Sequence, residues 1–97
     1  MMLSELLPGD FILTKRSTWN DVYGGMDYEC REYLVISVVI EGSRAEIIFL
    51  SDARELRRFR SMSYSYYSAS KTLVSRFLHG EVQIFRGSSM IFQSNNW

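Results

Sequence analysis

Hydrophobic and polar residues alternate most clearly in the middle of the chain, which is the pattern of β-strands. Valine and isoleucine dominate residues 32–40, and β-branched side chains favour a buried strand. Residues 44–51 alternate in the same way, and Gly42-Ser43 fits a two-residue turn with glycine first. The pattern predicts an antiparallel hairpin over 32–51. One face of its first strand would carry Leu34, Ile36, Val38 and Ile40, and the other Tyr33, Val35 and Val39.

Shorter strands are predicted near both ends of the chain. Residues 11–16 alternate directly after the turn sequence Pro8-Gly9-Asp10. Residues 81–86 alternate through Val82 and Ile84. These two segments give the first and the last strand of the predicted sheet.

A short helix is predicted before the last strand. Ser70 is a suitable N-cap for residues 71–79, and Gly80 would end the helix in the left-handed conformation. Its apolar side would carry Leu73, Val74, Phe77 and Leu78.

Residues 52–60 permit two interpretations. Asp52, with Glu55 three residues later, resembles a helix capping arrangement. The segment also alternates as a strand. We favour the strand, because the serines and tyrosines that follow Arg60 are poor helix formers and good strand formers.

Residues 17–31 contain no continuous apolar run and exceed the length of an ordinary connection. They are therefore either a functional loop or a further hairpin. Gly24-Gly25 favours the hairpin, since adjacent glycines tolerate the positive φ angles of a tight turn.

Five short strands, the Pro8-Gly9-Asp10 entry, the long excursion after the first strand and the helical turn before the last together resemble an SH3-like small β-barrel over residues 6–87. The resemblance implies a mainly β fold, a small five-stranded antiparallel barrel with one short helix before the last strand. Residues 1–87 would form this single domain and 88–97 a C-terminal tail. Such barrels often bind partners through the first long loop, although one fold hosts many functions.

The composition fits one small folded domain. The chain has 97 residues, 46% of them hydrophobic and 14% aromatic, and its 11 basic side chains balance its 11 acidic ones. High aromatic content and zero net charge exclude a disordered chain. A single cysteine excludes an internal disulfide, and no apolar run is long enough to span a membrane. We therefore expect a cytoplasmic protein that has no membrane contact.

Charge is distributed unevenly along the chain. Residues 1–53 hold nine acidic and four basic side chains, whereas residues 54–97 hold two acidic and seven basic ones. Two oppositely charged regions would help to steer a partner during association. Nine of the eleven basic residues are arginine, which suits paired contacts with carboxylates and phosphates.

Catalytic chemistry finds little support in the sequence. His79 is the only histidine and Cys30 the only cysteine, and neither lies in a nucleophile motif. We expect His79 to complement the end of a helix and Cys30 to be a small core residue. No carboxylates follow a metal-loop spacing, and no glycines form a phosphate-binding motif. The expectation is a protein that is not an enzyme and has no metal or cofactor.

Protein binding is the function that we favour. The segment 17–31 combines aromatic anchors with acidic residues, a composition typical of interfaces. Small neutral chains of this kind are common among phage or accessory regulators that bind a host protein, and we carry that origin as a hypothesis. The apolar tail at 90–92 could also join two copies of the chain. The partner-binding residues would be Trp19, Asp21, Tyr23, Met26, Asp27 and Tyr28.

Nucleic-acid binding is the alternative. Four arginines lie within residues 54–60 and tyrosines follow up to residue 67, and such residues can neutralise phosphates and stack on bases. The zero net charge of the chain is unlike that of most nucleic-acid-binding domains. This surface would use Arg54, Arg57, Arg58, Arg60, Tyr64 and Tyr66.

Overall fold

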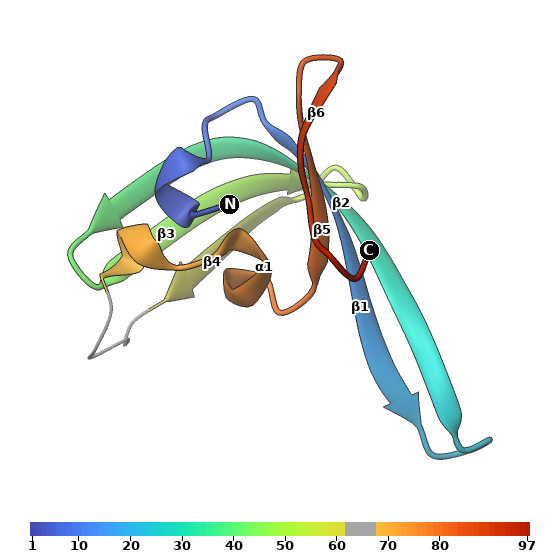
Figure 1. Cartoon of the computed structure of the whole chain (residues 1–97). Helices are drawn as coiled ribbons and strands as arrows, with labels where there is room; N and C mark the ends of the chain where they lie inside the picture. The colour runs from blue at the N-terminus through green and yellow to red at the C-terminus, as the bar shows by residue number, and fades with distance from the viewer. Residues whose placement is uncertain (62–67) are drawn as a thin grey trace.

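One antiparallel sheet of six strands, in the order β4-β3-β2-β1-β5-β6, forms the molecule. The structure is a computed structural model that describes residues 1–61 and 68–97 (Figure 1). The strands are β1 (Phe11–Asn20), β2 (Gly25–Glu41), β3 (Arg44–Ser51), β4 (Leu56–Ser61), β5 (Glu81–Arg86) and β6 (Ser89–Gln93). The helical segments are η1 (Leu3–Glu5), η2 (Ala69–Lys71) and α1 (Val74–Phe77).

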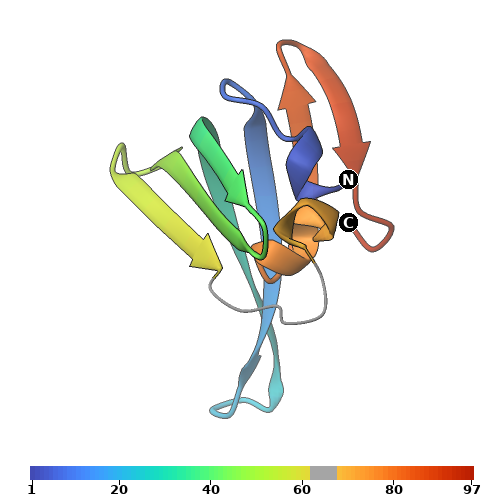
Figure 2. The ribbon, with the colours of Figure 1, turned by 90° about the vertical axis from the view of Figure 1, so that its left-hand side faces the viewer.

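The mainly β prediction is confirmed, but the sheet differs from the expected barrel. It has six strands rather than five, and it does not close, since β4 and β6 lie at opposite ends of the strand order. The helical segments lie on one side of the curved sheet (Figures 1 and 2). They bury the apolar face of the sheet, so that the fold needs no contact between its two end strands.

The core lies between these helical segments and the face of the sheet that we call the inner face. Phe49 is fully buried there, and its ring centroid lies 5.2 Å from that of Tyr33 and 5.3 Å from that of Phe59. Burying side chains of this size contributes about 1.5–3 kcal/mol each before entropy is subtracted. The buried apolar residues are Leu3, Leu6, Ile12, Val35, Ala45, Ile47, Phe49, Ala69, Val74, Phe77, Val82 and Ile84.

A β-bulge at Ile36 corrects the predicted faces of β2. Val35 pairs with Phe49 and Ser37 pairs with Ile48, so Ile36 has no partner across the ladder. The extra residue reverses the alternation from that point onward. Val35 and Val38 therefore share the inner face, whereas Ile36 is 45% exposed. The hairpin over 32–51 is confirmed, and Gly42 adopts a φ of 61° at its turn.

The outer face of the sheet carries one continuous row of large apolar side chains, with one contributed by each strand. The strand register aligns them directly across the sheet. The two at the ends of the row, Leu56 and Met90, are 69% and 51% exposed. The row is Leu56, Leu50, Leu34, Phe11, Phe85 and Met90.

The predicted helix over 71–79 is shorter than expected. It divides into η2 and the single turn α1, and the left-handed position belongs to His79, with a φ of 55°, rather than to Gly80. Gly80 is needed for another reason. A Cβ at this position would lie 2.9 Å from the carbonyl oxygen of Lys15, so glycine lets the chain approach β1 closely.

Residues 56–61 form strand β4, as the favoured interpretation predicted. The capping helix that would begin at Asp52 is absent, because the chain turns between β3 and β4. The amide of Ser51 donates to the carbonyl of Glu55 at 2.9 Å, and Arg54 takes a left-handed φ of 58° within that turn.

Residues 89–93 of the predicted tail form the edge strand β6. Its neighbour Ser94 is buried, and its hydroxyl accepts a hydrogen bond from the amide of Val82 at 2.9 Å. Ile91 is bulged, since Met90 pairs with Phe85 and Phe92 pairs with Ile84. The C-terminal residues are thus part of the sheet.

Candidate binding site on the β1–β2 arm

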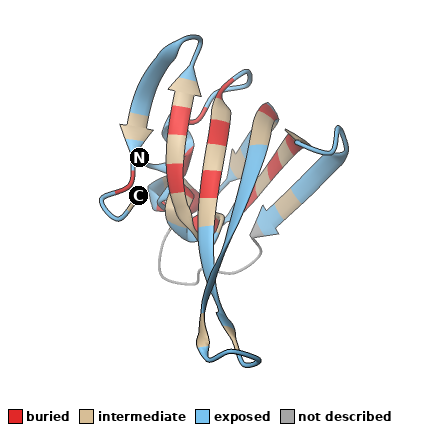
Figure 3. Ribbon diagram, turned by 90° about the vertical axis from the view of Figure 1, so that its right-hand side faces the viewer, coloured by how far each residue is buried: buried red, intermediate tan, exposed pale blue. Residues whose placement is uncertain are grey.

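The β1–β2 hairpin extends well beyond the rest of the sheet (Figure 1). The pairing of β1 with β5 stops at Lys15, opposite Glu81, and the pairing of β2 with β3 starts at Tyr33, opposite Ser51. In the described part of the chain, residues 16–32 therefore form a two-stranded ribbon, which we call the arm. Figure 3 shows exposed residues along its length, so both faces of the arm are open to a partner.

The arm confirms the hairpin interpretation of residues 17–31, with a longer turn than Gly24-Gly25 alone. The turn lies between Asn20 and Gly25. The side-chain oxygen of Asn20 accepts from the amide of Val22 at 2.9 Å, and its carbonyl accepts from the amide of Gly24 at 3.0 Å. Gly24 has a φ of 66°, which the turn requires and glycine adopts without strain.

Three large side chains gather on the outer face of the arm. Trp19 pairs directly with Met26, and Tyr28 lies on the same face two residues further along β2. Their exposed fractions are 61%, 47% and 64%, respectively. The ammonium of Lys15 lies 5.1 Å from the centre of the Tyr28 ring, a cation–π contact that orients the ring. We call Trp19, Met26 and Tyr28 the aromatic stripe.

The other predicted partner-binding residues lie apart from this stripe. Asp27 faces the opposite side of the arm, where it accepts hydrogen bonds from the hydroxyl of Tyr23 and, at 2.8 Å, from the side-chain amide of Asn20. The Tyr23 bond and then the Asn20 bond lower the pKa of Asp27, and the first of these raises the pKa of Tyr23. Asp21 lies in the turn. The two faces thus differ, since one is apolar and the other hydrogen-bonded and charged.

The inner face of the arm is held by ion pairs at its root. The Arg31 guanidinium lies 2.9 Å from Glu29 and 3.7 Å from Asp52, which follows β3. These pairs are about half exposed and contribute about 0–1 kcal/mol each. The second of these pairs links the arm to the end of β3.

Cys30 is exposed on the outer face of the arm, so its prediction as a core residue is wrong. The alternation around Cys30 is real. However, the helical segments cover the inner face of the sheet body, whereas both faces of this part of β2 are exposed. Alternation identifies the face of a strand but not whether anything packs against it.

The four arginines of the predicted nucleic-acid surface do not lie on one face. Arg58 and Arg60 lie on the outer face, 3.3 Å and 2.8 Å from the carboxylate of Glu46. Arg57 lies on the inner face and contacts Glu55 at 2.9 Å, while Arg54 is exposed in the preceding turn. Tyr64 and Tyr66 lie outside the described residues. Carboxylates already neutralise much of the positive charge that phosphates would need.

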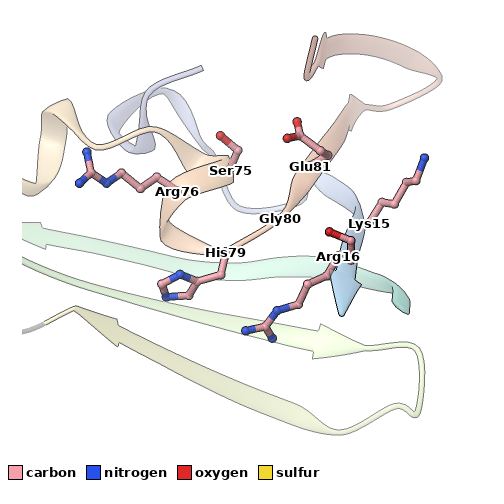
Figure 4. Close-up of a pocket in the computed structure, with 8 residues that line it drawn as sticks. Lys15, Arg16, Ser75, Arg76, His79, Gly80 and Glu81 are labelled. Atoms are coloured by element: carbon pink, nitrogen blue, oxygen red, sulfur yellow. The ribbon is translucent and has the colours of Figure 1, made fainter. Parts of the chain in front are cut away.

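A hollow of about 510 Å³ adjoins the root of the arm, at the open side of β1. Its walls come from β1 and from the segment between α1 and β5. In Figure 4, Arg16 and His79 project to the same side of β1, whereas Lys15 points the opposite way. The sequence did not reveal this hollow, because its walls are far apart along the chain. The lining residues are Lys15, Arg16, Ser17, Ser75, Arg76, His79, Gly80 and Glu81.

Other classes of site find no support in residues 1–61 and 68–97. No group of three or more histidine, cysteine or acidic side chains is placed to hold a metal ion. None of the helices in these two ranges has the length and apolar character needed to cross a bilayer. Comparison with protein-family models, with curated proteins and with solved structures finds no match to this chain.

Proposed function

We propose that this chain is a protein-binding module rather than an enzyme, and that the aromatic stripe of its arm is the binding surface. The stripe supplies an aromatic pair and a methionine, residue types that often dominate binding energy. The arm places them beyond the sheet, where a partner can approach without meeting the helical segments.

One observation carries the proposal. Trp19, Met26 and Tyr28 lie together on one face of a projecting ribbon and are about half or more exposed, whereas the opposite face is polar. A two-stranded ribbon is only marginally stable in water by itself. Large apolar side chains that cover no core of their own are characteristic of sites that a partner covers.

Site-specific photocrosslinking tests the proposal. A benzophenone amino acid is placed at Met26, between the two aromatic residues, and at Val39 as a matched position. Val39 is 48% exposed on the outer face of β2, far from the arm. We expect discrete crosslinked proteins from the Met26 position alone. Replacing Trp19 and Tyr28 with alanine should weaken binding of the identified partner about 30-fold or more for each residue, because such anchors contribute about 2 kcal/mol or more each.

The control for this loss is Leu56→Ala, which removes a similarly exposed apolar side chain from the edge strand β4. Circular dichroism would establish that each variant is folded. Equal crosslinking from Met26 and Val39, or unchanged partner affinity in the folded Trp19→Ala/Tyr28→Ala variant, would reject the arm as the binding surface.

A further inference from the structure

We infer that the arm binds the free C-terminus of a partner protein as an added β-strand, with the terminal carboxylate in the hollow beside Arg16 and His79. This inference rests on the proposed function and specifies the partner segment. It combines an open strand edge, a cationic hollow at one end of that edge and the aromatic stripe alongside it.

The open edge is the side of β1 that faces away from β2. Strand β5 occupies that side only from Phe11 to Lys15, so from Ser17 to Asn20 no other described strand is bonded there. Backbone N–H and C=O groups along such an edge are a ready template for an extended peptide. Four residues of strand extend over about 13 Å, enough for a short peptide.

The position of the hollow fixes the direction of that peptide. Strand β5 is antiparallel to β1 and begins at Glu81, opposite Lys15. A peptide that continues the line of β5 along the arm, in the same direction, would end just before Glu81 and place its C-terminus in the hollow. The reverse direction would place an N-terminal ammonium there.

The charges of the hollow favour a carboxylate over an ammonium. Its lining includes Lys15, Arg16 and Arg76 and the carboxylate of Glu81, and Figure 4 shows the Arg76 side chain directed away from Arg16 and His79. The Lys15 ammonium is directed elsewhere, to the carbonyl of Trp97 at 3.3 Å and to the ring of Tyr28. Arg16 has no ion pair within the described ranges. Its planar guanidinium matches a carboxylate with two parallel hydrogen bonds.

The same arrangement explains the place of the aromatic stripe. Ser17 and Trp19 face outward from β1, so alternate side chains of an added strand would lie beside them on the outer face. Trp19 would then contact an apolar side chain of the peptide, with Met26 next to it on β2. We therefore expect the preferred peptide to have apolar residues at alternate positions and to end in a free carboxylate.

Selection from a library of random ten-residue peptides displayed with free C-termini tests the inference. The selected sequences are synthesised with either a C-terminal carboxylate or a carboxamide, and their affinities are measured by fluorescence anisotropy. Amidation should weaken binding about tenfold or more, since hydrogen bonds between charged groups are the strong ones. Arg16→Ala should weaken the acid by a similar factor and leave the amide nearly unchanged.

Arg44→Ala is the matched control, because Arg44 is exposed at the start of β3 and has no ion pair in the described part of the chain. Amide NMR shifts upon binding should concentrate in residues 17–20 rather than 25–32.

Failure to select any peptide, equal affinity of acid and amide, or shifts confined to residues 25–32 would overturn the inference. If peptides bind with equal affinity as acid and amide but bind the Trp19→Ala variant more weakly, the proposed function is kept and the inference about the C-terminal carboxylate is rejected. If Trp19→Ala has no effect on any selected peptide, the proposed function also fails for these ligands.

Discussion

Asp10 connects the N-terminal segment to the strand β5 far along the chain. Its side chain is buried, and its two carboxylate oxygens accept hydrogen bonds from the Arg86 guanidinium, both at 2.9 Å. The amide of Leu7 donates to the same carboxylate at 2.9 Å. Burial raises the pKa of Asp10, but the hydrogen bonds from Arg86 and Leu7 and the charge of Arg86 together outweigh it and lower the pKa below its usual value.

Asp10→Asn should lower the free energy of unfolding at pH 7 by about 1–3 kcal/mol, because two charge-assisted hydrogen bonds are lost. The pKa of Asp10 is lower in the folded state, so its ionised form stabilises the fold above the unfolded pKa of about 3.9. This stability is lost as the pH falls through the lower folded pKa. The difference between wild type and variant should therefore narrow below about pH 4. Urea unfolding at pH 7, 5, 3 and 2 measures it.

Asp21→Asn is the control for this experiment, since Asp21 is exposed in the turn of the arm. A gap between wild type and Asp10→Asn that stays constant down to pH 2 would contradict the linkage.

At the scale of single elements, strand β2 shows what sequence alternation can and cannot predict. The two strands of the 32–51 hairpin and the turn at Gly42 follow directly from branched apolar residues and a glycine that can adopt positive φ. The bulge at Ile36 does not follow, because residues 33–40 are apolar at every position except Ser37 and fit either phase. Pairing with β3 and the core decides the phase.

The bulge leads to different expected effects for neighbouring residues. Val35→Ala should destabilise the fold by about 1–3 kcal/mol, since Val35 is 1% exposed and packs in the core. Ile36→Ala should change stability by about 0.5 kcal/mol or less, because Ile36 faces solvent. Denaturant midpoints of the two variants measure the difference. A strand without the bulge would also place Val35 and Ile36 on opposite faces. Val38→Ala is therefore the third variant, which distinguishes the bulged register from strict alternation. It should be more damaging than Val39→Ala, and a larger loss for Ile36 than for Val35 would exclude the observed register.

The candidate binding site was less predictable than the strands. The composition of residues 17–31 indicated aromatic anchors. It did not show that Trp19, Met26 and Tyr28 lie together on one face while Tyr23 and Asp27 lie apart from them. That separation comes from the register of the β1–β2 ladder, in which one face carries the stripe. The hollow beside Arg16 was not predictable, because it forms only where the α1–β5 segment approaches β1.

On the scale of the whole molecule, the C-terminal residues form the last strand of the sheet and are not a separate tail. Phe92 packs against the core, and the side chains of Gln83 and Gln93 are hydrogen-bonded at 2.8 Å. Whether this segment also joins two copies of the chain is a separate prediction. Substitutions at exposed residues of β6 can test it without removing the strand.

Deleting residues 88–97 should destabilise the fold by roughly 3–5 kcal/mol, comparable with the loss of a large core side chain together with its neighbours. The reason is that β5 would lose its ladder with β6, and Val82 its bond to Ser94. Thermal unfolding followed by circular dichroism measures the effect. Ile91→Lys is the comparison, since Ile91 is 39% exposed and this change leaves the strand in place. An unaltered melting temperature in the deletion would show that β6 is dispensable.

The edge strands β4 and β6 differ in what prevents a strand of another copy from pairing with them. At β4 the obstacle is charge, because Arg57, Arg58 and Arg60 outnumber the two carboxylates that pair with them and would lie against the arginines of a second copy if two such strands paired. At β6 the obstacle is shape, because the bulge at Ile91 distorts a strand that is already short. Concentrated salt screens charge and leaves a bulge unchanged. Any self-association induced by salt should therefore stop at pairs joined through β4, and filaments should not form.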